Sequence, residues 1–152
     1  MKVGRVTEAD DALATAVARL VPQLSPKRQA AGVAELAELV ATPGTSLIVA
    51  RDGADVLGML TLIVYRVPTG VRAWIHDVVV DETARGRGVG EALAREALRL
   101  AESAGAVSVE LTTRQEREAA NRLYRRLGFE LRETNMYVWR GREPGSRFEP
   151  GS

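Results

Sequence analysis

The chain has 152 residues, about the size of one domain, and 45% of them are hydrophobic, enough to form a core without cross-links. Its 21 basic and 20 acidic side chains leave a net charge of +1, which argues against bulk attraction to nucleic acid or to a membrane surface. The absence of cysteine excludes disulfides and thiolate metal sites, and no apolar run reaches the roughly 18 residues of a membrane span. We therefore expect a cytoplasmic protein, monomeric or homodimeric, that holds no metal and binds neither nucleic acid nor membrane.

The N-terminal part of the sequence predicts a short strand followed by two helices. Residues 3–6 have the composition of a strand, and Thr7 with Asp10 fits a capping box ahead of an amphipathic stretch that Pro22 ends. Ser25 followed by Pro26 is typical of a second helix start. These signals indicate two consecutive helices before the middle of the chain.

The middle of the chain reads as three consecutive strands. They are expected over 46–52, 56–67 and 72–81, where β-branched residues are frequent. Turn residues separate them at 52–53 and 68–70, so each connection is short enough for a hairpin. This part of the sheet should therefore be antiparallel.

The C-terminal part alternates between the two periodicities. Helices are expected over 88–103 and roughly 116–127, with a strand between them at 107–113 and one or two last strands within 129–140. The tail repeats Glu-Pro-Gly-Ser, a composition that favours disorder. The sequence thus predicts one domain over 1–140 and a flexible tail over 141–152.

The stretch "RGRGVG", residues 85–90, lies where a predicted strand meets a predicted helix. A helix start leaves about four N–H groups unpaired and carries partial positive charge, so phosphate oxygens bind there. Glycine lets the backbone approach such a ligand, and arginines add charge-assisted hydrogen bonds. An ordinary tight turn is the alternative. The spacing fits neither a P-loop, which needs Gly-Lys-Ser/Thr, nor the dinucleotide fingerprint, because Glu91 stands where the third glycine belongs.

With its strand and helix context, this stretch resembles the Arg/Gln-x-x-Gly-x-Gly/Ala signature of the GCN5-related N-acetyltransferases (GNAT). "AANRLYRRLGFE" is similar to the later helix of that family, with Tyr124, Gly128 and Phe129 matching its Leu-Tyr-x-x-x-Gly-Phe pattern. The resemblance covers roughly residues 2–140. It implies a three-layer α/β fold, with a mixed, mostly antiparallel sheet of six or seven strands flanked by about four helices. It also implies acetyl-CoA as co-substrate and transfer of its acetyl group to a primary amine of a small molecule or peptide.

The resemblance assigns residues to the cofactor. The predicted phosphate loop consists of Arg85, Gly86, Arg87, Gly88, Val89 and Gly90. The backbone of Val78, Val79 and Val80 would pair with the pantetheine arm, and Asn121 would contact the pantetheine or the nucleotide. Many members carry asparagine seven residues before the tyrosine, where this chain has Arg117, and that departure weakens the assignment of Asn121.

Three side chains are candidates for the chemistry. Tyr124 would act as the general acid at the sulfur, against the alternative of a tyrosine that only packs in the core. His76 is the single histidine, and free histidine titrates near 6.5, which suits a general base. Asp77 is its rival, because strict strand alternation would let only one of the two face the acceptor.

Other functions and the acceptor pocket stay open at the level of sequence. A non-catalytic module that binds CoA on the same fold is the main alternative, and an arginine-rich RNA binder is disfavoured by the low net charge and the 5% aromatic content. Tyr65, Trp74 and Thr112, with the connection over 20–25, are candidates to line the acceptor pocket.

Overall fold

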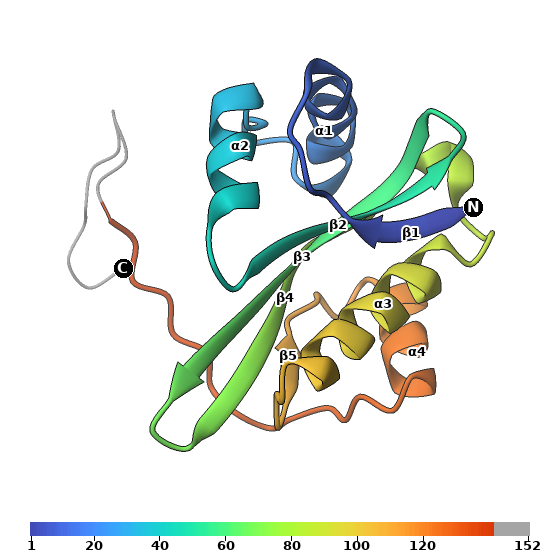
Figure 1. The fold of residues 1–152 in the computed structure, drawn as a ribbon. Helices are drawn as coiled ribbons and strands as arrows, with labels where there is room; N and C mark the ends of the chain where they lie inside the picture. Colours follow the sequence, from blue (N-terminus) through green and yellow to red (C-terminus); the bar gives the residue numbers. More distant parts are fainter. Residues whose placement is uncertain (142–152) are drawn as a thin grey trace.

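The computed structural model of the protein describes residues 1–141. Five strands form one sheet in the order β1-β2-β3-β4-β5 (Figure 1). They are β1 (Lys2–Arg5), β2 (Thr45–Asp52), β3 (Asp55–Val67), β4 (Gly70–Val80) and β5 (Val109–Leu111). The first four pair antiparallel and β5 runs parallel to β4. The predicted mixed, mostly antiparallel sheet is therefore confirmed.

Four α-helices and one short 3₁₀ turn complete the fold. They are α1 (Asp11–Leu24), α2 (Val33–Ala41), η1 (Glu82–Ala84), α3 (Val89–Ser103) and α4 (Glu118–Arg126). Figure 1 shows α1 and α2 on one side of the sheet and α3 and α4 on the other. The predicted three-layer α/β class is confirmed, with five strands among residues 1–141 in place of the expected six or seven.

Two apolar cores hold the layers together, one on each face of the sheet. Leu13, Val17 and Leu20 recur on one face of α1 and pack with buried residues of β2 and β3. On the other face, Leu93 and Ala97 of α3 pack against strand residues that alternate with the first set. The sheet is therefore covered on both faces, and the opening that matters lies at its β4–β5 edge.

The first two helices begin and end elsewhere than the sequence predicts. Asp10, and not Thr7, is the N-cap of α1, since its carboxylate accepts the Leu13 N–H at 2.8 Å, and the helix continues past Pro22 to Leu24. Ser25 and Pro26 open a tight turn closed by the Arg28 N–H on the Ser25 carbonyl at 3.2 Å. Proline fits the second position of a turn as well as the first position of a helix, so the pair alone does not distinguish them.

The last strands expected over 129–140 are not formed. Residues 129–141 carry neither helix nor strand, and large apolar side chains there, such as Tyr137 and Trp139, are exposed. The parallel partner β5 is only three residues long and offers a short edge for a further strand. Apart from Gly141, the predicted flexible tail lies outside the described residues.

Candidate functional site

The last residues of β4 have no neighbouring strand on the side of β5. Register between the two strands covers only the pairs Ala73–Val109, Trp74–Glu110 and Ile75–Leu111. β4 then continues to Val80, whereas β5 stops. Because each strand residue carries one donor and one acceptor, the open edge leaves backbone groups free for an extended ligand.

A β-bulge interrupts β4 at this point. Thr61 pairs with His76 and Met59 pairs with Val79, so β4 has one more residue than β3 between these pairs. Asp77 lies in the extra stretch with a φ of 54°, a left-handed conformation that aspartate tolerates better than most residues. In a regular strand, Ile75 and Val79 would lie on the same face of the sheet. Because of the bulge, Ile75 packs in the core under α3, whereas Val79 packs in the core under α1 and α2.

The bulge also changes which of the two candidate bases, His76 and Asp77, can face the groove. Counting strictly, only one of His76 and Asp77 could face the acceptor. In the structure both side chains are exposed, and both line the groove that opens beside β4. His76 also stacks on Trp74, with ring centroids 5.8 Å apart.

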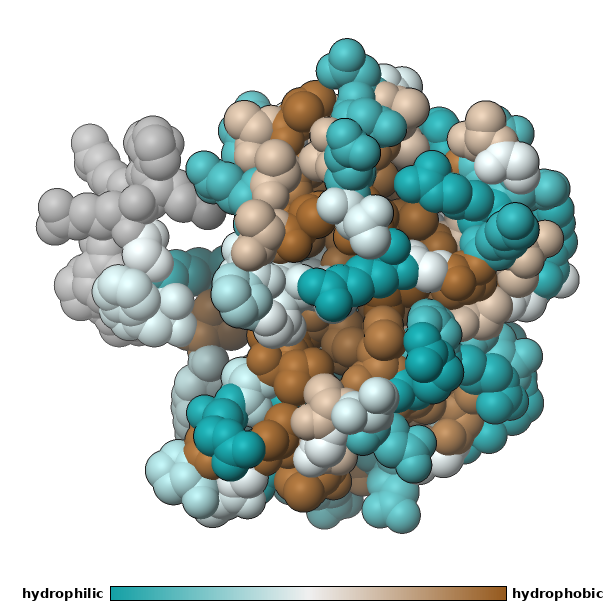
Figure 2. Space-filling view, viewed as in Figure 1, coloured by the Kyte–Doolittle hydropathy of each residue, from teal (hydrophilic) through white to brown (hydrophobic). Residues whose placement is uncertain are grey.

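The groove has a volume of about 1190 Å³ and runs between three walls. One wall is β4 from Ile75 to Val80. The second is the loop that precedes α3 together with the first turn of that helix, and the third is the 112–117 loop together with α4. Gln23 and Leu24 close it at the end of α1, inside the connection predicted to build the acceptor pocket. Figure 2 shows apolar residues gathered over the middle of the face seen there, with polar residues around the rim.

The glycine-rich stretch forms the N-terminus of α3 and the loop before it. Gly86 and Gly88 have φ of +78° and +77°, which side chains of L-residues rarely adopt, and a Cβ at either would meet open space. Gly88 is the N-cap of α3 and supplies no side-chain hydrogen bond. The N–H groups of the first turn therefore have no capping side chain, and Gly88, Val89 and Gly90 line the groove, which suits an anion site.

α1 is fixed to the start of this loop by two polar contacts. Arg19 Nε donates to the Asp81 carboxylate at 2.8 Å, and the Glu82 N–H donates to Gln23 Oε1 at 2.8 Å. Asp81 also accepts the Thr83 N–H at 3.1 Å. This last bond, aided by Arg19, holds the pKa of the Asp81 carboxyl below its ordinary value. The sequence gives no local signal for a pair 62 residues apart.

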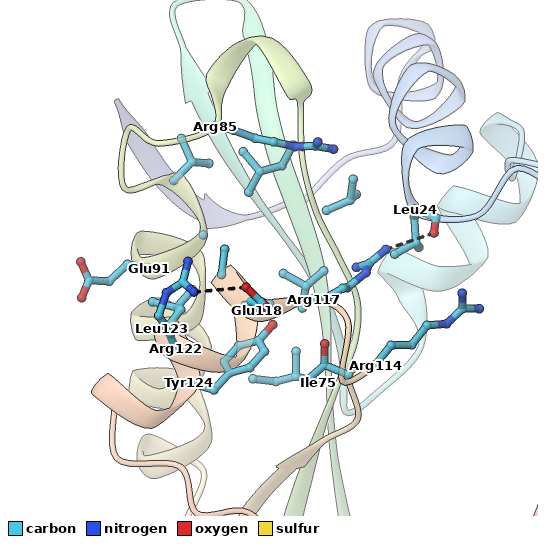
Figure 3. Close-up of a pocket in the computed structure, with 18 of the residues that line it drawn as sticks. Leu24, Ile75, Arg85, Glu91, Arg114, Arg117, Glu118, Arg122, Leu123 and Tyr124 are labelled. Carbon is cyan, nitrogen blue, oxygen red and sulfur yellow. Dashed lines mark hydrogen bonds and ion pairs between the residues drawn. The ribbon is translucent and has the colours of Figure 1, made fainter.

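Tyr124 stands on the α4 wall, where α4 approaches β4. Its side chain is buried, it packs edge-on against Phe129 with ring centroids 5.6 Å apart, and it lines the groove (Figure 3). Burial raises the pKa of the Tyr124 phenol above its ordinary value, and the positive charge of Arg117 opposes part of that rise. The phenol is therefore protonated at neutral pH and can donate.

The structure brings most of the predicted site residues to this groove. His76, Asp77, Val78, Val79, Val80, Arg85, Gly86, Gly88, Val89, Gly90 and Tyr124 all line it. Two of them are placed elsewhere. Arg87 lies 3.8 Å from the Asp52 carboxylate, and the Asn121 amide donates to the carbonyls of Arg114 and Arg117 at 3.0 and 2.8 Å.

Of the candidate acceptor-pocket residues, Thr112 lines the groove, together with Gln23 and Leu24 of the connection over 20–25. Tyr65 and Trp74 do not, and Trp74 Nε1 is buried without a hydrogen-bond partner among the described residues. Within residues 1–141, no helix has the length and apolarity that crossing a membrane demands. No group of three acidic or imidazole side chains in that part of the chain could hold a metal ion.

Comparison with known proteins identifies the family of this chain. The chain belongs to the acetyltransferase (GNAT) family, whose model matches residues 13–129. It is similar to an uncharacterized N-acetyltransferase of Methanocaldococcus jannaschii, 44% identical over 61 residues. That match covers 40% of this chain and 27% of the relative, so the chain spans about a quarter of the length of that curated relative.

Solved structures share the fold over nearly the whole chain. A candidate acetyltransferase from Agrobacterium tumefaciens superposes with a TM-score of 0.80 at 23% identity, covering 92% of this chain and 100% of that one. An aminoglycoside acetyltransferase from an uncultured soil sample gives a TM-score of 0.80 at 19% identity, covering 93% and 96%. At these identities the likeness establishes the fold of the family.

Proposed function

We propose that this protein is an N-acetyltransferase that moves the acetyl group of acetyl-CoA to a primary amine of a small molecule or peptide. The observation that carries the proposal is one continuous groove, which runs from a glycine-lined helix start, along an unpaired strand edge, to a buried tyrosine. The domain would span residues 1–140 and act in the cytoplasm. The small-molecule acceptor is suggested by the fold shared with an aminoglycoside acetyltransferase.

The residues of the groove fit acetyl-CoA along its length. Its pyrophosphate would bind the free N–H groups at the start of α3, with Arg85 adding positive charge. Its pantetheine amides would pair with the open edge of β4 over Val78–Val80, as an added strand pairs with a sheet. Bound in this way, the cofactor supplies an activated acetyl thioester. Arg87, which lies outside the groove lining, would support the phosphate loop through its contact with Asp52, whereas Asn121 would hold the turn over 114–117.

The chemistry needs a base for the ammonium group of the acceptor and an acid for the departing sulfur. An alkylammonium has a pKa near 10.4, so most of it is protonated at neutral pH. His76 or Asp77, both exposed in the groove, would remove that proton directly or through one water. The amine nitrogen then forms a bond to the thioester carbonyl carbon and the carbon–sulfur bond breaks. Tyr124 donates a hydrogen bond or its proton to the departing thiolate, and the second proton that the nitrogen loses on becoming an amide goes to the thiolate or restores the phenol.

Thiol release from acetyl-CoA in the presence of a panel of amines tests the proposal. The expected result is release that depends on both the protein and an amine. A protein that binds acetyl-CoA by calorimetry but releases no thiol with any amine would instead be a non-catalytic CoA-binding module. A protein that does neither would contradict the assignment of the groove.

A further inference from the structure

The loop between β5 and α4 carries two arginines on one fixed turn. The Arg117 N–H donates to the Arg114 carbonyl at 3.1 Å, which closes residues 114–117 into a turn. Both arginine side chains are exposed, and both residues line the groove. The turn thus presents two guanidinium groups from one rigid piece of backbone.

Asn121 fixes this turn from the first part of α4. Its amide nitrogen donates to both carbonyls that bound the turn, 3.0 Å to Arg114 and 2.8 Å to Arg117. Each of these carbonyls also accepts one backbone N–H, so the Asn121 side chain adds a second hydrogen bond to both and ties the turn to α4. Asn121 acts here as a positioning residue for the turn, a role that its match to the family helix did not predict.

The two guanidinium groups lie on the acceptor side of the groove. Ile75 of β4 pairs with Leu111, so the chain after β5 passes at the level where β4 reaches His76 and Asp77. Figure 3 shows Arg114 and Arg117 extending toward the end of α1, away from Glu91, and shows Arg85 apart from them at the far end of the groove. Arg117 reaches the Leu24 carbonyl at 3.4 Å. The two guanidinium groups are thus separated from the start of α3, which is assigned to the pyrophosphate.

The turn over 114–117 carries two arginines and one glutamate, so its net charge is positive. Within residues 1–141, neither Arg114 nor Arg117 forms an ion pair with a carboxylate. Of the four carboxylates that line the groove, Glu91 is paired with Arg95 and Arg126, and Glu118 with Arg122. The other two, Asp77 and Glu116, lie farther than 4.0 Å from either guanidinium group of the turn. The groove therefore keeps two free positive charges beside the candidate base, and a bound anionic group would satisfy them with charge-assisted hydrogen bonds.

We propose that the acceptor carries an anionic group, a carboxylate, on the same molecule as its amine, and that Arg114 and Arg117 bind it. This inference rests on the proposed acetyl transfer and narrows its acceptor. The carboxylate would sit between the two guanidinium groups and direct the amine toward His76 and Asp77. Neutral or polycationic amines would meet the positive turn without that contact and bind more weakly.

Paired acceptors test the proposal, with ω-amino acids set against n-alkylamines of equal length, whose amine pKa values are close. In the wild-type protein kcat/KM should be about ten- to a hundred-fold higher for the amino acid of the best pair, the range of one or two hydrogen bonds to a charged group. Arg114→Gln should lower that ratio about ten-fold by raising KM for the amino acid more than KM for the alkylamine, and Arg117 would account for any preference that remains. Arg125→Gln, an exposed arginine of α4 outside the groove lining, is the matched control and should keep the ratio.

Asn121→Ala separates positioning from cofactor contact. Loosening the turn should lower the ratio as Arg114→Gln does, while the affinity for acetyl-CoA stays at its wild-type value. Circular dichroism of each variant checks that the fold is retained. A fall in acetyl-CoA affinity with an unchanged acceptor ratio would overturn the positioning role of Asn121.

Three outcomes would overturn the inference. Turnover of alkylamines and amino acids at equal rates would remove the anion preference and leave acetyl transfer intact. A rise in the KM of acetyl-CoA for Arg114→Gln that disappears with acetyl-dephospho-CoA would assign the arginines to the nucleotide phosphate. Absence of thiol release with every acceptor would overturn the transfer reaction, and the acceptor class with it.

Discussion

Tyr124 presents a protonated phenol inside the groove, because burial outweighs the nearby charge of Arg117 in setting its pKa. Tyr124→Phe keeps the ring, the packing against Phe129 and the volume, and removes only the hydroxyl. Turnover should fall by roughly 10²–10⁴, the usual worth of a positioned acid, while acetyl-CoA affinity changes little. Steady-state kinetics with calorimetry checks this expectation. Tyr137→Phe, at an exposed tyrosine, is the control, and wild-type turnover in Tyr124→Phe would leave the hydroxyl with a packing role alone.

His76 and Asp77 are placed on the same stretch of groove wall by the bulge, so substitution must decide which is the base. The value of kcat/KM should rise with pH as the base loses its proton. His76→Ala should flatten that rise if the imidazole is the base, with a deficit that shrinks as pH approaches about 10, where the amine arrives neutral. Asp77→Asn should flatten it if the carboxylate is the base. A profile unchanged in both variants would mean that the acceptor loses its proton to solvent.

Glycine substitutions at the start of α3 test whether this helix end binds the pyrophosphate. Substituting Gly88 would add strain of about 1–2 kcal/mol because of its positive φ, which makes Gly90 the cleaner position. A Cβ at Gly90 would stand 3.4 Å from Leu123 and 3.7 Å from Val80, which are ordinary contacts. Gly90→Val should weaken acetyl-CoA binding by about a hundred-fold, the worth of one or two hydrogen bonds to a charged group.

The control for the glycine test is Gly4→Val in β1. Gly4 has no atom within 4 Å of a Cβ and lies outside the groove lining, so the same change there should leave binding unaltered. Calorimetry on both folded variants gives the comparison. Unchanged affinity in Gly90→Val would remove the start of α3 from the cofactor site.

Elements whose signals are local were predictable from the sequence. The start of α3 at Val89 and its end before Gly105 follow from glycine spacing and apolar periodicity, and the structure has both. The start of α2 was not predictable, because Ser25-Pro26 suits a turn equally well. The bulge at Asp77 was not predictable either, because it depends on how β3 pairs with β4 and leaves no periodic pattern in the sequence. That single residue decides that both candidate bases reach the groove.

The contact between α1 and the phosphate loop acts at the scale of the whole molecule. Asp81 is buried and accepts bonds from Arg19 and Thr83, so it joins the first helix to the end of β4. Asp81→Asn replaces one acceptor oxygen by an NH₂ group that opposes Arg19. Unfolding in urea should show a loss of about 1–3 kcal/mol, the range for hydrogen bonds to a charged group.

The pH dependence of that stability has a definite sign. Because the pKa of Asp81 is lowered in the folded protein, its contribution is fully present above about pH 4, the unfolded value, and is lost as pH falls through the folded pKa. Asp81→Asn should therefore lose less stability than the wild type between about pH 4 and pH 2. Parallel acid unfolding curves for the two proteins would contradict the assignment.

Acetyl transfer itself is the central claim, and the stoichiometry of one reaction tests it most directly. Wild-type protein is incubated with isotopically labelled acetyl-CoA and an ω-amino acid, thiol release is followed, and the product is weighed by mass spectrometry. We expect one labelled acetamide for each thiol released. Thiol release without an acetylated amine would show hydrolysis in place of transfer, and binding of acetyl-CoA with neither product, for this acceptor and for every amine of the panel, would show a module that only holds the cofactor.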